Sequence, residues 1–232
     1  MPLYLNSTMN KYEEDGGIAM PEIHHSIASV MRERSSVRKY KKGLRIPEHI
    51  LEEIMSLAGA APSGWNLQHW KFIVIQEEER KQRLLPIAYN QEQIVDCSAV
   101  VAVLGDWEAN NNAEKVCDAA VQAGYMTPQA RDKLVHQIHH TYATDDSIDA
   151  KDGVINPSLA AMQLMLAAAS LGISSCPIGG FNHEELRREL QFPDRYKPVM
   201  LITLGYAEKT AHQTIRFPIE DIVDYEVFGG KA

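Results

Sequence analysis

Basic and hydroxyl side chains gather in the segment RSSVRKY, which begins at Arg34. Arg34, Ser36 and Arg38 occupy alternate positions, so an extended strand would point all three to the same side. Two guanidinium groups and a hydroxyl that converge can bind a phosphate or the electron-rich edge of a ring. A solvated basic arm has the same pattern, and this segment alone favours that simpler interpretation.

A second unusual stretch is APSGWNLQHW, from Ala61 to Trp70, which contains two of the three tryptophans of the chain. It lies between an expected helix and an expected strand, where short solvated connections are the rule. A solvated connection explains its polar residues and leaves the tryptophans unexplained. The polar and turn-forming positions are Pro62, Ser63, Gly64, Asn66, Gln68 and His69.

Three further pieces carry groups that suit a flat polar ligand. Asn90 and Gln93 in YNQEQ offer amide donors and acceptors, although helix capping explains Asn90 equally well. The glycines of PIGG, Pro177 to Gly180, let a backbone approach a ligand closely, or simply form a tight turn. Arg216 in TIRFP is a third candidate, with a plain surface charge as the alternative.

Hydrophobic periodicity predicts interleaved helices and strands, which indicates one α/β-type domain. The most regular segment, 157–171, is apolar on nearly all faces, so it is expected to be a helix buried on all sides. Asn156 is its expected cap, and Pro157 its first residue. Residues 1–22 read as a loose arm, and 107–150 as a helical excursion that could act as a lid. Helices are expected at 24–34, 47–61, 77–87, 112–123, 128–142, 157–171 and 183–190, and buried strands at 72–75, 99–104, 173–176 and 199–204.

The composition narrows the class of protein. The 232 residues include 45% hydrophobic and 23% charged residues, which is ordinary for a globular chain. A net charge of -8 repels nucleic acid and acidic lipid, so neither is expected as a partner. The apolar run 159–171 is too short to span a membrane. The tail 207–232 is irregular but rich in apolar residues, which must be buried somewhere, for example on another subunit.

The sequence lacks most of the other motifs that would indicate a function. Three widely spaced cysteines without a CxxC pattern indicate reduced thiols, and the N-terminus lacks the pattern of a signal peptide, so a cytoplasmic location is expected. The sequence has no GxGxxG, Walker A or GxSxG motif. His136, His139 and His140 could share part of a helix face, but a solvated face is favoured over a metal site.

Taken together, the five pieces resemble the FMN-dependent nitroreductase family, in its order and roughly its spacing. RSSVRKY is similar to the Arg-x-Ser-x-Arg/Lys-x-aromatic opening of that family, and APSGWNLQHW to its Ala-Pro-Ser-Ser-x-Asn-x-Gln-Pro-Trp segment. NQEQIVDCSAVVAV, CPIGGF and LGYAEKTAHQTIRFP match later segments, so the resemblance covers about residues 24–222. It implies an α+β fold of three layers, with a central mixed sheet flanked by helices, in an intertwined homodimer that exchanges C-terminal tails.

The resemblance also implies the cofactor and its site. FMN would lie at the dimer interface, and Pro62, Ser63, Gly64, Asn66 and Gln68 would reach the FMN of the other subunit. Arg38 would stabilise the anionic reduced flavin, and Arg216 would pair with the phosphate. The remaining positions implied are Arg34, Ser35, Ser36, Asn90, Gln93, Pro177, Ile178, Gly179 and Gly180.

By the same resemblance, the chain is an enzyme that takes electrons from NADH or NADPH and reduces nitroaromatics or quinones by a ping-pong mechanism. The flavin would carry the chemistry, with no catalytic side chain, while Trp65 and the 107–150 insert would line the substrate cavity. Dehalogenation, enone reduction and flavin binding without turnover remain alternatives. The sequence departs from the family pattern at Gly64, His69, Gln93 and Thr214, and the last two lack a lysine found in some relatives.

Overall fold

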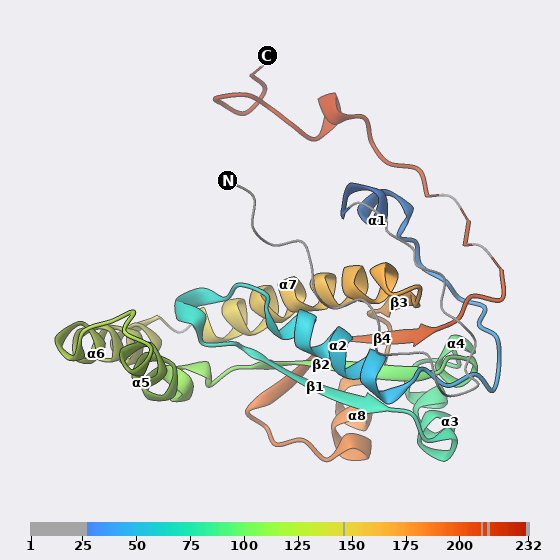
Figure 1. Cartoon of the computed structure of the whole chain (residues 1–232), viewed down its shortest axis with the longest axis horizontal. Helices are drawn as coiled ribbons and strands as arrows, with labels where there is room; N and C mark the ends of the chain where they lie inside the picture. The colour runs from blue at the N-terminus through green and yellow to red at the C-terminus, as the bar shows by residue number, and fades with distance from the viewer. Residues whose placement is uncertain (1–26, 146, 210, 213, 231–232) are drawn as a thin grey trace, which may run out of the picture.

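The computed structural model describes residues 27–145, 147–209, 211–212 and 214–230 (Figure 1). The predicted arm 1–22 therefore lies outside the described residues, as does the start of the helix expected at 24–34. The described part of that helix is α1 (Ile27–Glu33).

A four-stranded sheet forms the centre of the molecule, in the order β1-β2-β4-β3. All three neighbouring pairs run antiparallel. The expectation of a mixed sheet therefore needs correction, because the parallel pairing found in the described residues is an isolated bridge between Ser36 and Ser175. The strands are β1 (Trp70–Ile75), β2 (Ala99–Asp106), β3 (Ser174–Ile178) and β4 (Tyr196–Gly205).

The predicted three layers are confirmed, because both faces of the sheet carry helices (Figure 1). Every residue of β2 is buried. Its alternate side chains enter two separate cores. Val101 packs with α2 (Glu48–Gly59) and α7 (Ile148–Ser170). Val100 packs with the helices on the other face, which are α3 (Glu78–Ile87), α4 (Gln93–Asp96) and α8 (His183–Leu190).

The start of α7 differs from its prediction. The helix begins at Ile148, so Pro157 lies inside it and Asn156 is not its cap. Proline has no backbone N–H, so the carbonyl of Gly153, four residues earlier, loses its helical partner. The Asn156 side chain instead donates to the Asp152 carbonyl at 2.9 Å and is free to accept from a distant segment.

The freed turn of α7 lies directly against β2. A Cβ added to Gly105 would overlap the carbonyl group of Gly153, and a Cβ on Gly153 would overlap the Trp107 ring. Glycine at 105 and 153 therefore lets the helix approach the strand more closely than side chains would allow. This close approach is possible at the point where Pro157 has released the Gly153 carbonyl.

Within the described residues, α7 is also the one helix that is long and apolar enough to cross a bilayer, judged by length and composition. Half of its most apolar window is buried inside the structure, and the central helix of a globular domain meets the same criteria. The expectation that the helix is buried on all sides is wrong for a single chain. Val154, Ile155, Leu159 and Met162 remain exposed on α7.

The predicted insert forms a helical lobe that projects beyond one end of the sheet (Figure 1). It contains η2 (Ala109–Asn112), α5 (Ala113–Gln122) and α6 (Pro128–Thr144). Thr127 caps α6 by accepting from the N–H of Ala130 at 3.2 Å. Leu67, from the turn before β1, is buried in the core of this lobe, so the insert and that turn pack as one unit.

The close packing of α7 on β2 gives a stability prediction. Replacing Gly105 with Ala should lower the free energy of unfolding by about 1–3 kcal/mol, because the new methyl group meets backbone that cannot move easily. Gly59→Ala is the matched control, since nothing lies within 4 Å of its added Cβ. That variant should be unchanged, or more stable by about 0.5–1 kcal/mol. Urea denaturation of both variants measures the difference, and equal midpoints would contradict the predicted contact.

Candidate functional site

The segment from Arg34 to Arg38 lies beside β3. Ser36 bridges Ser175, and the N–H of Val37 donates to the Ser175 carbonyl at 3.0 Å. Val37 is buried, Arg34 and Ser36 are half-buried, and Arg38 is exposed. The predicted alternation therefore holds in outline, since one apolar side chain faces the core while its polar neighbours remain accessible.

Two polar atoms beside this segment are buried without a partner among the described residues, namely Arg34 Nη1 and Ser175 Oγ. Both residues line a cavity of about 180 Å³ between α1, β3 and the end of α7. An unpartnered buried donor costs free energy, and a charged one costs more. A guanidinium and a hydroxyl beside one cavity are groups that can donate to an anionic ligand such as a phosphate. The volume is small for a whole nucleotide, so further surfaces must contribute.

The predicted amide and glycine segments do meet in the structure. Gln91 joins them, because its Nε2 atom donates to the Gly180 carbonyl at 2.9 Å. Gln93 Nε2 donates to Gln91 Oε1 at 3.1 Å, and Asn90 has a left-handed backbone with φ 58°. Gly179 is open, with nothing within 4 Å of an added Cβ. Gln91 was not among the predicted site residues, although it lies between the two predicted amides, Asn90 and Gln93.

An ion pair connects these segments to the first one. Lys39 Nζ lies 3.1 Å from Glu92 Oε2, at the end of the Arg34–Arg38 segment. The structure therefore brings together most of the predicted residues that come from three separate parts of the chain. We call this set the β3 group; it comprises Arg34, Ser35, Ser36, Arg38, Asn90, Gln93, Pro177, Ile178, Gly179 and Gly180.

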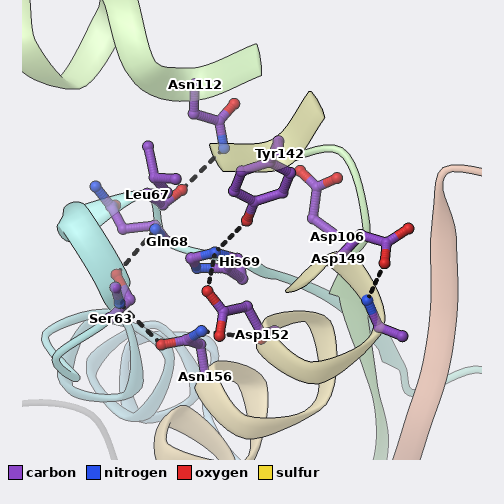
Figure 2. Close-up of polar contacts among 12 residues, drawn as sticks. Ser63, Leu67, Gln68, His69, Asp106, Asn112, Tyr142, Asp149, Asp152 and Asn156 are labelled. Carbon is purple, nitrogen blue, oxygen red and sulfur yellow. Dashed lines mark hydrogen bonds and ion pairs between the residues drawn. The ribbon is translucent and has the colours of Figure 1, made fainter. Parts of the chain in front are cut away.

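The turn 62–68 lies elsewhere, beside the N-terminal half of α7, and includes η1 (Gly64–Asn66). Figure 2 shows the contacts that hold it. The N–H of Gly64 donates to Asn156 Oδ1 at 2.9 Å, and the N–H of Gln68 donates to Ser63 Oγ at 3.0 Å. From the insert, Asn112 Nδ2 donates to the Leu67 carbonyl at 2.9 Å.

His69, which the sequence left unexplained, is fully buried behind this turn. Its Nε2 atom lies 2.9 Å from the Tyr142 hydroxyl of α6 and 3.9 Å from Asp152 Oδ2 of α7 (Figure 2). Burial lowers the pKa of His69 below its ordinary value, and the carboxylates of Asp152 and Asp106 oppose that shift. His69 is therefore neutral at neutral pH. Sequence reasoning could not find this contact, because its partners are far away along the chain.

The two tryptophans of the turn have different surroundings. Trp65 is half-buried and packs against the core of the insert, with its ring centroid 6.4 Å from that of Tyr142. Trp70 begins β1, two residues before the start of the strand predicted at 72–75. Trp65 is therefore a packing contact between the turn and the insert within one chain.

Arg216 is not brought to either group. It is exposed, and its Nη1 atom donates to the carbonyl of its neighbour Ile215 at 3.1 Å. The tail that carries it runs away from the body of the molecule (Figure 1). This tail contains one short helix, η3 (Ile219–Asp221). Its exposed apolar side chains are Ile215, Phe217, Ile219, Ile222, Val223, Tyr225, Val227 and Phe228.

The histidines of α6 make contacts within the insert. His139 Nε2 lies 3.0 Å from Glu114 Oε1 on α5, and the rings of His136 and His140 stack at a centroid distance of 6.3 Å. Across the described ranges, no group of three or more His, Cys, Asp or Glu residues is arranged to hold a metal ion.

Comparison with known proteins agrees with this arrangement. Residues 31–206 match the family model described as "Nitroreductase family". A Bacillus subtilis (strain 168) protein named "Putative NAD(P)H nitroreductase YodC" is 46% identical over 194 residues, which are 83% of this chain and 95% of that protein. The "CLA biosynthesis enone reductase" of Lactiplantibacillus plantarum is 29% identical over 208 residues, covering 88% of this chain and 95% of that protein.

A solved structure shares both the fold and the sequence pattern. It is a protein of Exiguobacterium sibiricum 255-15, described as a "putative nitroreductase in complex with FMN", with a TM-score of 0.82 and 36% identity. The similarity covers 87% of this chain and 98% of that one. The family-model match, over residues 31–206, includes both the β3 group and the turn 62–68. The chain therefore belongs to the Nitroreductase family.

Proposed function

We propose that this chain binds FMN and acts as an NAD(P)H-dependent oxidoreductase that reduces small nitroaromatics or quinones. The observation that carries the proposal is the pair of buried, unpartnered atoms, Arg34 Nη1 and Ser175 Oγ, beside one cavity. Relatives support it, because one is named for NAD(P)H and nitroreductase activity and a solved neighbour is in complex with FMN.

The residues of the β3 group fit the chemistry of FMN. Arg34 and Ser36 suit its phosphate, since a guanidinium and a hydroxyl both donate to phosphate oxygens. Asn90 and Gln93 suit the polar edge of the ring, because amides both donate and accept. Gly179 and Gly180 are exposed and lack side chains, so their backbone is open to a flat ring. Arg38 would place positive charge at the electron-rich edge of the ring.

A second copy of the chain would complete the site. The turn 62–68 contacts α7 at Asn156, whereas the cavity beside Arg34 reaches that helix at Ala169, so the two sets of residues lie apart within one copy. The exposed apolar tail and the exposed residues of α7 support a homodimer in which the tails are exchanged. In that assembly, Pro62, Ser63, Gly64, Asn66 and Gln68 would contact the FMN of the partner, and Arg216 would reach a phosphate.

The side chains bind and orient, and none is assigned as an acid or base. When bound, FMN supplies hydride-transfer chemistry between the nicotinamide and the acceptor. The Tyr142 hydroxyl is a poor candidate for a proton donor, because it is hydrogen-bonded to His69 and burial raises its pKa. Nicotinamide and acceptor would use the same place in turn, which gives ping-pong kinetics. Trp65 and the insert would border that place as a lid.

Enone reduction is the second candidate, because one relative is an enone reductase of similar length. A flavin-binding protein without turnover is the non-enzymatic alternative. We also propose a cytoplasmic location, which the three buried free thiols, Cys97, Cys117 and Cys176, support because they suit a reducing compartment.

The first prediction concerns the cofactor and the reaction. The purified protein should be yellow, lose its flavin absorption with NADH or NADPH in the absence of oxygen, and regain it with a quinone or nitroaromatic. Initial rates should give parallel double-reciprocal lines, as ping-pong kinetics requires. A yellow protein inert to both nicotinamides would favour the non-enzymatic alternative, and an enone that outcompetes quinones would favour the second candidate. Failure to take up FMN would refute the proposal.

The second prediction concerns Arg34. Arg34→Met should weaken FMN binding about 10- to 100-fold, because a charge-assisted hydrogen bond to the phosphate is lost. The FMN-free variant should be at least as stable as the parent, since the lost Nη1 atom is buried without a partner. Arg32→Met, at an exposed position of α1, is the control and should bind FMN normally. Titration of FMN fluorescence and thermal melts measure both quantities; an unstable Arg34→Met with normal affinity would show a structural role instead.

The third prediction concerns assembly. The parent should sediment at twice the mass of one chain. A double variant, Ile222→Asp and Phe228→Asp, should shift the equilibrium toward the monomer and lose FMN, because charge would have to be buried with the tail. Tyr125→Asp, at an exposed position on the insert, should remain dimeric. A monomeric parent that binds FMN fully would contradict the shared site.

A further inference from the structure

The turn before β1 has a strained backbone. Trp65, Asn66 and Gln68 all have left-handed conformations, with φ of 48°, 58° and 54°. Left-handed conformations cost free energy for residues other than glycine, and they persist where the surrounding structure holds them. The backbone bonds inside the turn join near neighbours only, so contacts from other elements must supply the restraint.

Those contacts come largely from the helical insert. Asn112 donates to the Leu67 carbonyl at 2.9 Å, and Leu67 and Trp65 pack in the core of the insert. The remaining tie is the 2.9 Å hydrogen bond between His69 Nε2 and the Tyr142 hydroxyl. Figure 2 shows that this hydroxyl points inward to the imidazole from α6. The turn is therefore fastened on one side to α7 through Asn156 and on the other side to the insert.

The His69–Tyr142 hydrogen bond ties the residue directly after the turn to α6. His69 is fully buried, and its Nδ1 atom has no partner among the described residues. A buried imidazole without a second partner is held by its one hydrogen bond and by packing. The backbone of His69 is held by β2, because its carbonyl accepts from the Asp106 N–H at 2.9 Å. The orientation of its imidazole, directly behind the strained residues, depends on where α6 holds the Tyr142 hydroxyl.

We propose that His69 is a positioning residue, whose hydrogen bond to Tyr142 lets the helical insert hold the strained turn in the conformation that binds FMN. The inference rests on the proposed function, because that function assigns the turn 62–68 to the FMN site. It predicts that FMN affinity depends on an insert residue through His69 rather than through contact with the ligand. The insert then has a role in cofactor retention in addition to its proposed role as a lid.

The test compares Tyr142→Phe with a matched control, using the full-length protein stripped of FMN. Phenylalanine keeps the ring beside Trp65 and removes the hydroxyl alone. His139→Gln is the control, because it breaks a 3.0 Å contact between α5 and α6 that does not reach the turn. Titration with FMN at pH 8 should show a Kd raised about 3- to 10-fold for Tyr142→Phe, as expected for one net hydrogen bond. His139→Gln should stay within about twofold of the parent, on the same scale.

Three outcomes separate the possibilities. A parental Kd in Tyr142→Phe would overturn the inference. An equal rise in His139→Gln would also overturn it, because any loosening of the insert would then suffice. A parent protein that binds no FMN at all would instead refute the proposed function, on which the inference depends.

A pH profile adds a readout that a purely structural role would not change. The groups that face His69 are Tyr142 from α6, Asp152 from α7 and Asp106 from β2. Burial lowers the pKa of His69, so the neutral form is fully present above about 6.5, the ordinary value. As the pH falls below that value toward the lowered pKa, protonation competes with the bound conformation and FMN affinity should fall.

The control for this profile is His69→Gln, which cannot titrate. The FMN phosphate itself titrates near a pKa of about 6, but it does so equally in both proteins. The ratio of the two Kd values should therefore isolate His69. We expect affinity to fall more steeply in the parent than in His69→Gln between pH 7 and pH 5.5. Parallel profiles would overturn the inference, even if Tyr142→Phe failed to fold.

Discussion

The packing of α7 on β2 is the contact on which the rest of the structure depends. Glycine at 105 and 153 lets the helix and the strand approach until backbone meets backbone. Pro157 makes this possible, because it removes the N–H that would otherwise hold the Gly153 carbonyl inside the helix. The same local release leaves the Asn156 side chain free to accept from Gly64 and so to fix the turn before β1.

From this contact, α7 reaches both sets of residues that we propose bind the ligand. Asp152 and Asn156, near its middle, support the turn 62–68, while Ala169 near its end lines the cavity beside Arg34. Each set offers polar groups to a ligand, and neither encloses one. A rigid helix between two half-sites is well suited to a symmetric pair of chains, in which each copy supplies one half of two identical sites.

Much of this arrangement follows from the sequence. Hydrophobic periodicity placed the helices and strands because buried faces repeat at regular spacing. The structure brings the polar segments around Arg34, Asn90 and Gly179 close together, and their binding of FMN stays a prediction. The start of α7 was wrong because Pro157 after Asn156 has the pattern of a helix start. The freed turn around Gly153 packs against Gly105, which belongs to another element, so this contact could not be inferred from the local sequence.

Other features depend on contacts between distant parts of the chain. The antiparallel pairing of the sheet is a matter of topology, since buried strands look alike in either direction. His69 is explained by Tyr142, and Gln91 by Gly180, and neither pair is close in sequence. Arg216 was predicted at the phosphate, and a single chain gives it no such neighbour, so its placement stays a prediction.

The exposed apolar tail affects how newly synthesised chains associate. Phe217 and Phe228 have no cover in a single copy, and uncovered apolar surface favours association of any kind. If the tail docks on a second copy, pairing competes with aggregation, and the outcome depends on how quickly chains meet. Synthesis of many copies close together would then favour the ordered pair, so local chain concentration would govern the yield of native protein.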